Sequence, residues 1–311
     1  MNESRPAAPA SASRPAALRR DAMGAERRPW LGVALCLPLG LFLVAVFLVP
    51  VAGLLPASLT ATPGVLGRGL EAADGATLAN YARALSPRGE LAAFRNSFLL
   101  SASVALASLL LCLPPAWLLA RRDFPGKGAL RTVLALPLTF SGVIVGFLAI
   151  LVLGRLGLLP TLLAALTGER LLAGSAYTLG GLAAAYVYFE VPRAVLTLEA
   201  AFRRLDPEVE EAAATLGAGP WQRLRRIWLP LSWPAVASTL AVTFAASMGS
   251  FGVALVLARR LSVVPLSIYT QYTGFLDSGL AAALCLLLAA VTLAANGLLR
   301  LAFRGRDYVY G

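Results

Sequence analysis

The sequence predicts an all-α polytopic membrane protein with six transmembrane helices and a helical hairpin outside the bilayer between helices 4 and 5. Composition is the first indication, because 58% of the 311 residues are apolar and only 14% are charged, against about 45–50% and about 25% in an average soluble domain. The second is a mean hydropathy of +0.74. The third is the recurrence of apolar runs of about 20 residues, the length that crosses hydrocarbon as a helix. Together they argue against a soluble enzyme, a disordered chain and a nucleic-acid-binding domain.

The apolar runs define the six predicted spans: 30–54, 98–120, 133–153, 176–196, 235–257 and 280–303. The fourth is the weakest, because Glu190 and Arg193 lie near its end. A charge at the centre of a membrane helix costs about 2.5–3.5 kcal/mol. These two residues are i,i+3 neighbours toward one end, where pairing and snorkelling lower that cost. We therefore retain the fourth span.

Basic residues predict the orientation, since cytoplasmic loops are richer in Lys and Arg. With the N-terminus inside, the cytoplasmic segments hold 19 basic residues and the external segments hold 8. Both termini are then cytoplasmic. The net charge of +11 is explained by this topology and by contact with anionic lipid, so we expect no nucleic-acid partner.

Four regions result from the spans. Residues 1–29 are predicted to be a disordered cytoplasmic tail, and 30–92 a first transmembrane helix with an external loop. Residues 93–304 hold helices 2 to 6, and 305–311 form a cytoplasmic C-terminal tail. The first span is longer than the apolar core of a signal peptide and comes after a long Arg-bearing segment, so it is interpreted as an uncleaved anchor.

Catalytic and metal chemistry has little support in the composition. There is no His at all, which removes the commonest general base and the commonest metal ligand. The three Cys stand alone in apolar runs and form no metal-binding or disulfide pattern. We expect no catalytic residue and no metal site.

The most specific local pattern lies between the fourth and fifth spans, in residues 206–230. Asp206 is a predicted helix N-cap and Pro207 the first helical residue, with acids in the next turns where the helix dipole favours them. Gly217 or Gly219 supplies the positive φ of a helix end, and Pro220 begins a second helix. The pattern predicts a short, rigid hairpin on the cytoplasmic side. An amphipathic surface connector is the simpler alternative.

Seven positions in this segment resemble the signature cytoplasmic loop of permease subunits of binding-protein-dependent ABC importers: Glu211, Ala212, Ala213, Gly217, Ile227, Leu229 and Pro230. Their spacing is Glu-Ala-Ala, three residues, Gly, nine residues, Ile-x-Leu-Pro. Further similarity comes from Asn96-Ser97, from Pro114 and Pro115, which are expected to interrupt the second span, and from Leu134-Ala135-Leu136-Pro137. The resemblance covers about residues 93–304, which it identifies as the permease core.

The resemblance implies a type I importer permease in a bacterial inner membrane. Such permeases pair with a second permease subunit, the same or homologous, and dock this loop as a coupling helix onto a dimer of ABC ATPase subunits. A periplasmic or lipid-anchored solute-binding protein delivers the solute. No cofactor is expected in this chain, and ATP is bound by the partner. Gly126-Lys127, which comes closest to a Walker A loop, lacks the first Gly and the hydroxyl residue.

Polar residues within the spans are candidates for the translocation path. They are Glu190, Thr139, Ser141, Ser247 and Ser250. Glu190 paired with Arg193, and hydroxyls bonded to backbone, are the structural alternatives. The pattern Ser250-Phe251-Gly252 resembles the branch whose permeases carry polyamines, ferric iron, thiamine or phosphonates, and this favours a polyamine-like or other small polar solute.

Two other classes of function remain as alternatives. An ion-coupled secondary transporter needs paired intramembrane carboxylates or an ion site in a broken helix, but Glu190 has no partner Asp in the central spans. A membrane-embedded transferase is disfavoured by the absence of His and of clustered acids in the spans.

Overall fold

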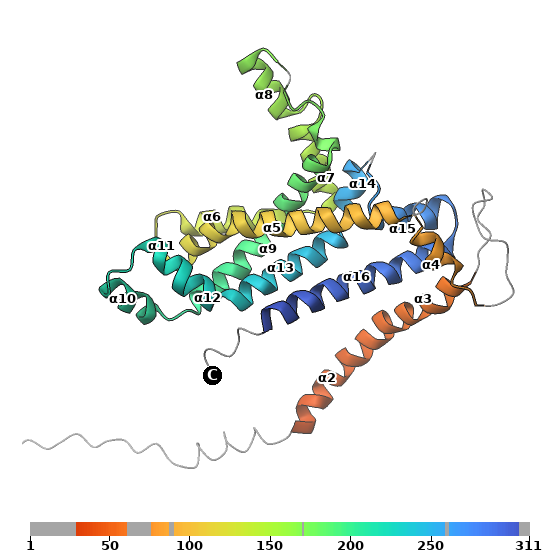
Figure 1. Cartoon of the computed structure of the whole chain (residues 1–311), viewed down its shortest axis with the longest axis horizontal. Coiled ribbons are helices and arrows are strands. Elements are labelled where there is room, and N and C mark those ends of the chain that lie inside the picture. The colour runs from red at the N-terminus through yellow and green to blue at the C-terminus, as the bar shows by residue number, and fades with distance from the viewer. Residues whose placement is uncertain (1–28, 61–75, 87–89, 170, 259–260, 305–311) are drawn as a thin grey trace, which may run out of the picture. The chain divides into compact units, whose positions relative to one another are not determined.

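The computed structural model describes residues 29–60, 76–86, 90–169, 171–258 and 261–304, and all regular elements within these ranges are helices (Figure 1). This confirms the predicted all-α class. The chain forms two compact units, 1–53 and 54–311. The C-terminal tail and residues 1–28 of the predicted N-terminal tail lie outside the described residues.

The first unit contains one apolar helical stretch. It consists of α2 (Pro29–Leu43), the π-helical segment η2 (Val44–Leu48) and the first residues of α3 (Val49–Leu59). Residues Cys36–Leu59 form a candidate membrane span of 24 residues with mean hydropathy 2.5, and none of its side chains is buried in the 18-residue window. A helix that is apolar on all sides and buries nothing needs lipid or another protein around it.

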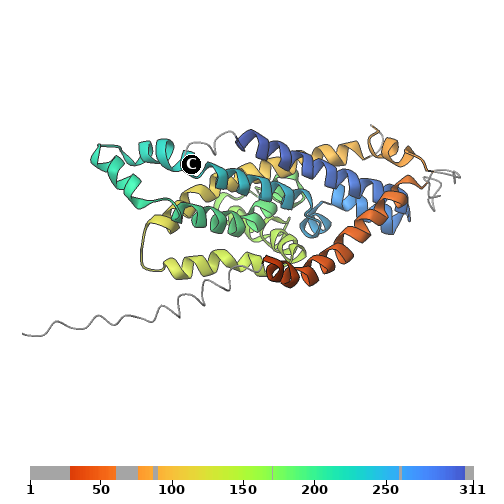
Figure 2. The ribbon, with the colours of Figure 1, turned by 90° about the horizontal axis from the view of Figure 1, so that it is seen from below.

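The second unit is built on a bundle of four long helices (Figures 1 and 2): α5 (Leu91–Arg121), α9 (Leu179–Arg203), α13 (Trp233–Met248) and α16 (Ser278–Arg304). α5 packs most extensively along α9, and α13 packs against α5, α9 and α16. Small residues on α5, such as Ser101, Ala105 and Ser108, are buried. They let the neighbouring backbones approach closely, as is typical of helices packed in a membrane.

Short elements cover one end of the bundle. They are α4 (Ala79–Ala84), α15 (Val264–Tyr269) and the π-helical η6 (Thr270–Gly274), all of which pack against α16. Arg83 Nη1 lies 2.9 Å from the buried carboxylate of Asp277. Asn80 Nδ2 donates to the carbonyls of Ser58 and Thr60 at the end of α3, at 2.9 and 2.8 Å. These bonds fix the connection between α3 and α4.

Within the described residues, four helices are long and apolar enough to cross a membrane, and a bent pair makes a fifth. The four are Cys36–Leu59, Leu91–Arg121, Gly142–Thr167 and Ser278–Leu299, and the pair, Trp221–Trp228 with Trp233–Met248, bends by 82°. α9 is not among them, because it carries Glu190, Arg193 and Glu199 along its length. The predicted total of six spans stays a prediction.

The third predicted span, 133–153, is not one continuous helix. α6 (Lys127–Ala135) leads into the 3₁₀ turn η3 (Leu136–Thr139), and α7 (Gly142–Leu153) begins after a break. Pro137 in η3 has no backbone N–H to continue the ladder, and Ser141 caps α7 by accepting from Ile144 N at 3.5 Å. Hydropathy alone does not detect this break, because both sides of it are apolar.

The apolar stretch also continues beyond the predicted end at Leu153. α8 (Leu158–Thr167) comes after α7 and a short loop, and the two helices lead away from the bundle rather than along it (Figure 1). The 3₁₀ turn η4 (Ser175–Tyr177) then returns the chain to α9.

Pro114 and Pro115 do not interrupt the second span, contrary to expectation. α5 runs through both prolines to Arg121. Proline is tolerated within membrane helices where packing and local adjustment of the helix compensate for the lost hydrogen bond. Here Cys112 and Ala116, on either side, are fully buried in the cluster shared with α9 and α13.

α7 crosses α14 (Gly252–Leu257) by direct contact of backbones. A Cβ atom added to Gly252 would lie 2.9 Å from Val143 N, and one added to Gly146 would lie 2.8 Å from Val256 Cβ. Gly142 and Gly146 are four residues apart on α7 and so share the face that meets α14. This small-xxx-small spacing, together with Gly252, permits the crossing.

Replacing Gly252 by Ala is expected to force α7 and α14 apart and to destabilise the protein by about 1–3 kcal/mol, the usual cost of overpacking. The measurement is the thermal midpoint of the detergent-purified protein. Gly297→Ala on α16 is the matched control, because nothing lies within 4 Å of its Cβ position. A Gly252→Ala protein as stable as the control would contradict the close crossing.

Candidate coupling site and polar residues of the bundle

The segment between α9 and α13 begins with a capped helix, α10 (Pro207–Thr215). Asp206 accepts a hydrogen bond from Glu208 N at 2.9 Å, which satisfies one of the free N–H groups at the helix start. Pro207 occupies the first helical position, where its missing N–H has no cost. Both features confirm the local structure that the sequence predicts.

α10 ends in a turn that fixes the angle of the hairpin. Gly217 has φ +81°, the left-handed conformation that glycine adopts without strain. Ala218 N donates to Ala213 O and Gly217 N donates to Ala214 O, both at 3.0 Å. This pair of bonds is a Schellman motif, which satisfies the last carbonyls of the helix. Of the two glycines that the sequence proposes for the turn, Gly217 is the one with positive φ.

The return limb of the hairpin is helical but irregular. It consists of α11 (Pro220–Arg223), the π-helical η5 (Leu224–Trp228) and α12 (Leu229–Leu231). Ile227 is half-buried in η5, and Leu229 and Pro230 open α12. The chain then bends into α13.

The tip of the hairpin presents apolar side chains to the outside. Leu216 is 88% exposed and Trp221 is 69% exposed. Among the residues of the signature, Glu211, Ala212 and Gly217 are exposed and Ala213 is half-buried. These two side chains are therefore available for contact with another molecule.

Both ends of the hairpin are attached to the C-terminal end of α5 by one side chain. Arg121 Nη2 donates to Leu205 O, just before α10, at 2.9 Å. The same guanidinium lies over the indole ring of Trp228, 5.5 Å from its centroid. Trp228 is 3% exposed, and its ring also lies against Trp117 of α5, with centroids 4.8 Å apart.

A second ionic contact joins α6 to the same end of α9. The buried carboxylate of Glu199 pairs with Arg131 of α6 and, at 3.1 Å, with Arg203 one turn further along α9. Arg203 lies in the last turn of α9, where a cation complements the helix dipole.

The hairpin lies at the end of the bundle where α5 and α9 have their C-termini, and α4 and α15 lie at the opposite end (Figures 1 and 2). The hairpin therefore projects beyond this end of the bundle, next to the ends of two helices that pack along each other.

Glu190 is buried and already has a partner. Its two carboxylate oxygens accept from Arg193 Nη1 at 3.2 and 2.9 Å, and the residue is 2% exposed. The geometry is that of an i,i+3 ion pair within α9, which is the structural alternative to a role of Glu190 in the translocation path.

The four hydroxyl residues proposed for the path fall into two groups. Ser141 and Ser250 flank the close contact of Gly142 with Gly252, at the breaks before α7 and before α14. The carbonyl of Ser250 accepts from Tyr186 at 2.7 Å. Thr139 is exposed and bonds to Leu136 O, and Ser247 is buried on α13. The structure thus brings Ser141 and Ser250 to one junction but not the other two.

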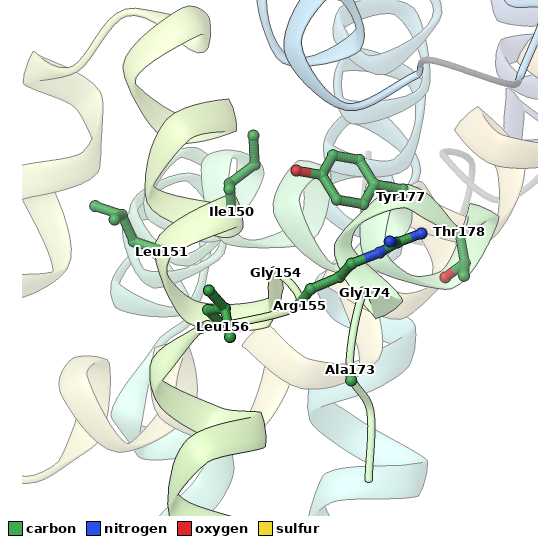
Figure 3. Close-up of a pocket in the computed structure, with 10 residues that line it drawn as sticks. Ile150, Leu151, Gly154, Arg155, Leu156, Ala173, Gly174, Tyr177 and Thr178 are labelled. Carbon is green, nitrogen blue, oxygen red and sulfur yellow. The ribbon is translucent and has the colours of Figure 1, made fainter. Parts of the chain in front are cut away.

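A cavity of ≈ 780 Å³ opens beside the loop between α7 and α8. Arg155 extends past Gly174 toward Thr178, and the ring of Tyr177 lies above the Arg155 side chain in this view (Figure 3). No carboxylate among the described residues pairs with Arg155. This arrangement leaves a positive charge available to a ligand.

Three residues of these sites are not identified by the sequence patterns: Arg121, Trp228 and Arg155. In the sequence, Arg121 is one of the charges that orient the membrane topology, and it belongs to the Ala120-Arg121-Arg122 stretch at the end of the second span. Its contact with Leu205 spans 84 residues, and no local pattern predicts such a pairing.

Comparison with known proteins gives several relatives. The chain is 34% identical over 212 residues to the "Molybdenum transport system permease protein ModB" of Escherichia coli, covering 64% of this chain and 88% of that protein. It is 36% identical over 179 residues to the protein of the same name from Haemophilus influenzae, covering 55% and 76%. It is 32% identical over 211 residues to the "Sulfate transport system permease protein CysW" of Synechocystis, covering 64% and 74%.

The fold also matches a solved structure. A chain of a bacterial alginate ABC transporter, crystallised in complex with an alginate pentasaccharide-bound periplasmic protein, superimposes with a TM-score of 0.73. The match covers 91% of this chain and 94% of that chain, at 20% identity, so it shows the shared fold.

Residues 86–307 match the family described as "Binding-protein-dependent transport system inner membrane component". This match spans more than half of the chain. The chain therefore belongs to that family, as a multi-pass inner-membrane permease subunit of an ABC importer without an ATPase site of its own.

Proposed function

We propose that this permease moves a tetrahedral oxyanion of the molybdate or sulfate type and is driven through the hairpin 206–230, which docks onto a separate ATPase dimer. The observation that carries the proposal is the hairpin itself: a capped helix and a fixed turn that present Leu216 and Trp221 to a partner. The relatives named for molybdenum and sulfate transport support the solute class.

The hairpin is suited to transmit displacement because its internal geometry is fixed. The N-cap at Asp206 and the left-handed Gly217 determine where α10 begins and ends. Small residues at 212 and 213 permit close approach of another backbone. A flexible loop of the same length would absorb a push instead of passing it to the helices.

The arrangement of subunits is part of the proposal. Two permease chains, identical or homologous, line the path, and each presents its hairpin to the ATPase dimer in the cytoplasm. Both termini of this chain are then cytoplasmic, in agreement with the distribution of Lys and Arg. A binding protein delivers the solute from the other side.

An oxyanion fits the charges of the described residues better than a polyamine does. A polyamine path requires carboxylates that face the solute. Glu190 is already neutralised by Arg193, whereas Arg155 lines a cavity without a carboxylate partner among the described residues. The molybdenum and sulfate relatives therefore replace the polyamine, iron, thiamine and phosphonate branch as our preferred solute class. No observation favours the ion-coupled transporter or the transferase.

The solute class is tested by uptake of labelled molybdate into proteoliposomes that contain the permease, its ATPase and its binding protein. We expect ATP-dependent uptake that excess molybdate, tungstate or sulfate suppresses and excess spermidine leaves unchanged. Suppression by spermidine alone, or uptake without ATP, would overturn the assignment.

The docking role is tested by Gly217→Asp. An L-residue at φ +81° is strained, and the added charge lies at the tip that we assign to the ATPase contact. We expect the variant to insert in the membrane normally but to lose its ATPase subunit during purification, with about a hundredfold lower transport, comparable to the loss of a well-packed interface anchor.

Gly128→Asp on α6 is the matched control, because it adds the same charge at an exposed glycine with nothing within 4 Å of its Cβ position. It is expected to keep the ATPase. If Gly217→Asp also kept the ATPase and its transport rate, the hairpin would not be the docking element.

A further inference from the structure

We propose that Arg121 is a positioning residue that joins α5 to both ends of the hairpin, so that displacement of the hairpin by the ATPase moves α5 and α9 as one body. The inference rests on the proposed docking of the hairpin. Arg121, Leu205 and Trp228 together are called the clasp.

The first contact of the clasp is made at the end of α9. α9 ends at Arg203, and Leu205 O lies just beyond it, where a helix leaves carbonyls without partners inside the helix. Arg121 Nη2 donates to this oxygen at 2.9 Å. The bond is charge-assisted, and the cation complements the negative end of the helix dipole. The N-terminal end of the hairpin is therefore tied to α5.

The second contact is made at the other end of the hairpin. The guanidinium of Arg121 lies over the ring of Trp228 at 5.5 Å, a cation–π arrangement. Trp228 is buried, its ring lies against Trp117 of α5, and its carbonyl accepts from Ser232 Oγ at 2.6 Å. The start of the return to α13 is therefore tied to α5 as well.

A guanidinium is suited to both contacts at once. It is planar, so its face lies on the indole ring while an edge N–H group donates to a carbonyl. A lysine ammonium has the charge but not this shape, so it cannot satisfy the ring and Leu205 O together in the same way. The neighbouring Arg122 has an exposed side chain.

The clasp determines how the bundle responds when the hairpin moves. Because both ends are held by one residue of α5, the hairpin cannot rotate about either end alone. α5 is also the main packing partner of α9. Displacement of the hairpin is then passed to the two most extensively packed helices of the bundle. Without Arg121, the same push changes the angle between the hairpin and α5.

The direct test measures that angle in the full complex with its ATPase. Spin labels are placed at Thr215→Cys on α10 and Ala107→Cys on α5, both exposed, in a chain whose three native cysteines are replaced by alanine. Electron–electron distances are recorded without nucleotide and with ATP and vanadate. We expect the distance between the two labels of one chain to be narrow and unchanged by ATP and vanadate. In Arg121→Gln the distance is expected to broaden and to shift with nucleotide, whereas Arg122→Gln behaves like the parent.

A second measurement quantifies the coupling of transport to ATP. The number of molybdate ions imported per ATP hydrolysed is expected to fall about fivefold in Arg121→Gln, with the ATPase still bound and active, because two contacts of moderate strength are lost. Trp228→Leu is expected to have a similar effect. The double variant should be no worse than either single variant, since all three break the same clasp. Arg121→Lys should recover only part of the loss.

The outcomes separate this inference from the proposed docking role. If Arg121→Gln keeps both the narrow distance and the parent number of ions per ATP, while Gly217→Asp loses the ATPase, the clasp is wrong and the docking stands. If Gly217→Asp keeps the ATPase, the docking is wrong. Additive losses in the double variant would also overturn the clasp, because they would show two independent roles.

Discussion

Every backbone N–H and C=O group at membrane depth must be satisfied within the protein, and this constraint determines most of the architecture. It explains why the regular elements of the described residues are helices. The breaks at Phe140–Ser141 and at 249–251 lie next to the place where α7 crosses α14. The Ser141 cap and the bond from Tyr186 to Ser250 O satisfy groups that the breaks expose. The close glycine contact keeps that junction narrow.

In the cytoplasmic position that we propose for the hairpin the constraint is different, because water satisfies free backbone groups and a connector has no need of regular structure. The hairpin is nevertheless capped at Asp206 and closed by a Schellman turn at Gly217. Its tip exposes Leu216 and Trp221, and its two ends meet Arg121. Rigidity, exposed apolar contact area and attachment to the bundle are the three properties required of an element that receives force from another subunit.

Features set by neighbours within a few residues are predictable from the sequence. The N-cap at Asp206, Pro207 at the first helical position and the turn near Gly217 all depend on local backbone geometry.

Features set by distant segments are not predictable from the sequence. Just after the break at Ser141, Gly142 meets Gly252, more than 100 residues away. α5 continues through Pro114 and Pro115, with Cys112 and Ala116 packed against residues of α9 and α13. The charge of Glu190 singles it out in the sequence, but its pairing with Arg193 is only one of two interpretations there. The contact of Arg121 with Leu205 has no local signal at all. The solute class is also poorly predicted, because the loop signature carries no information on the cargo.

The most direct test of hairpin-driven transport is a structure of the assembled importer in a lipid nanodisc, with its ATPase dimer bound to ATP and vanadate. We predict that Leu216 and Gly217 lie in a groove of the ATPase on the cytoplasmic side, with Arg121 still in contact with Leu205 and Trp228. A hairpin buried in lipid, or one on the side that faces the binding protein, would contradict this mechanism.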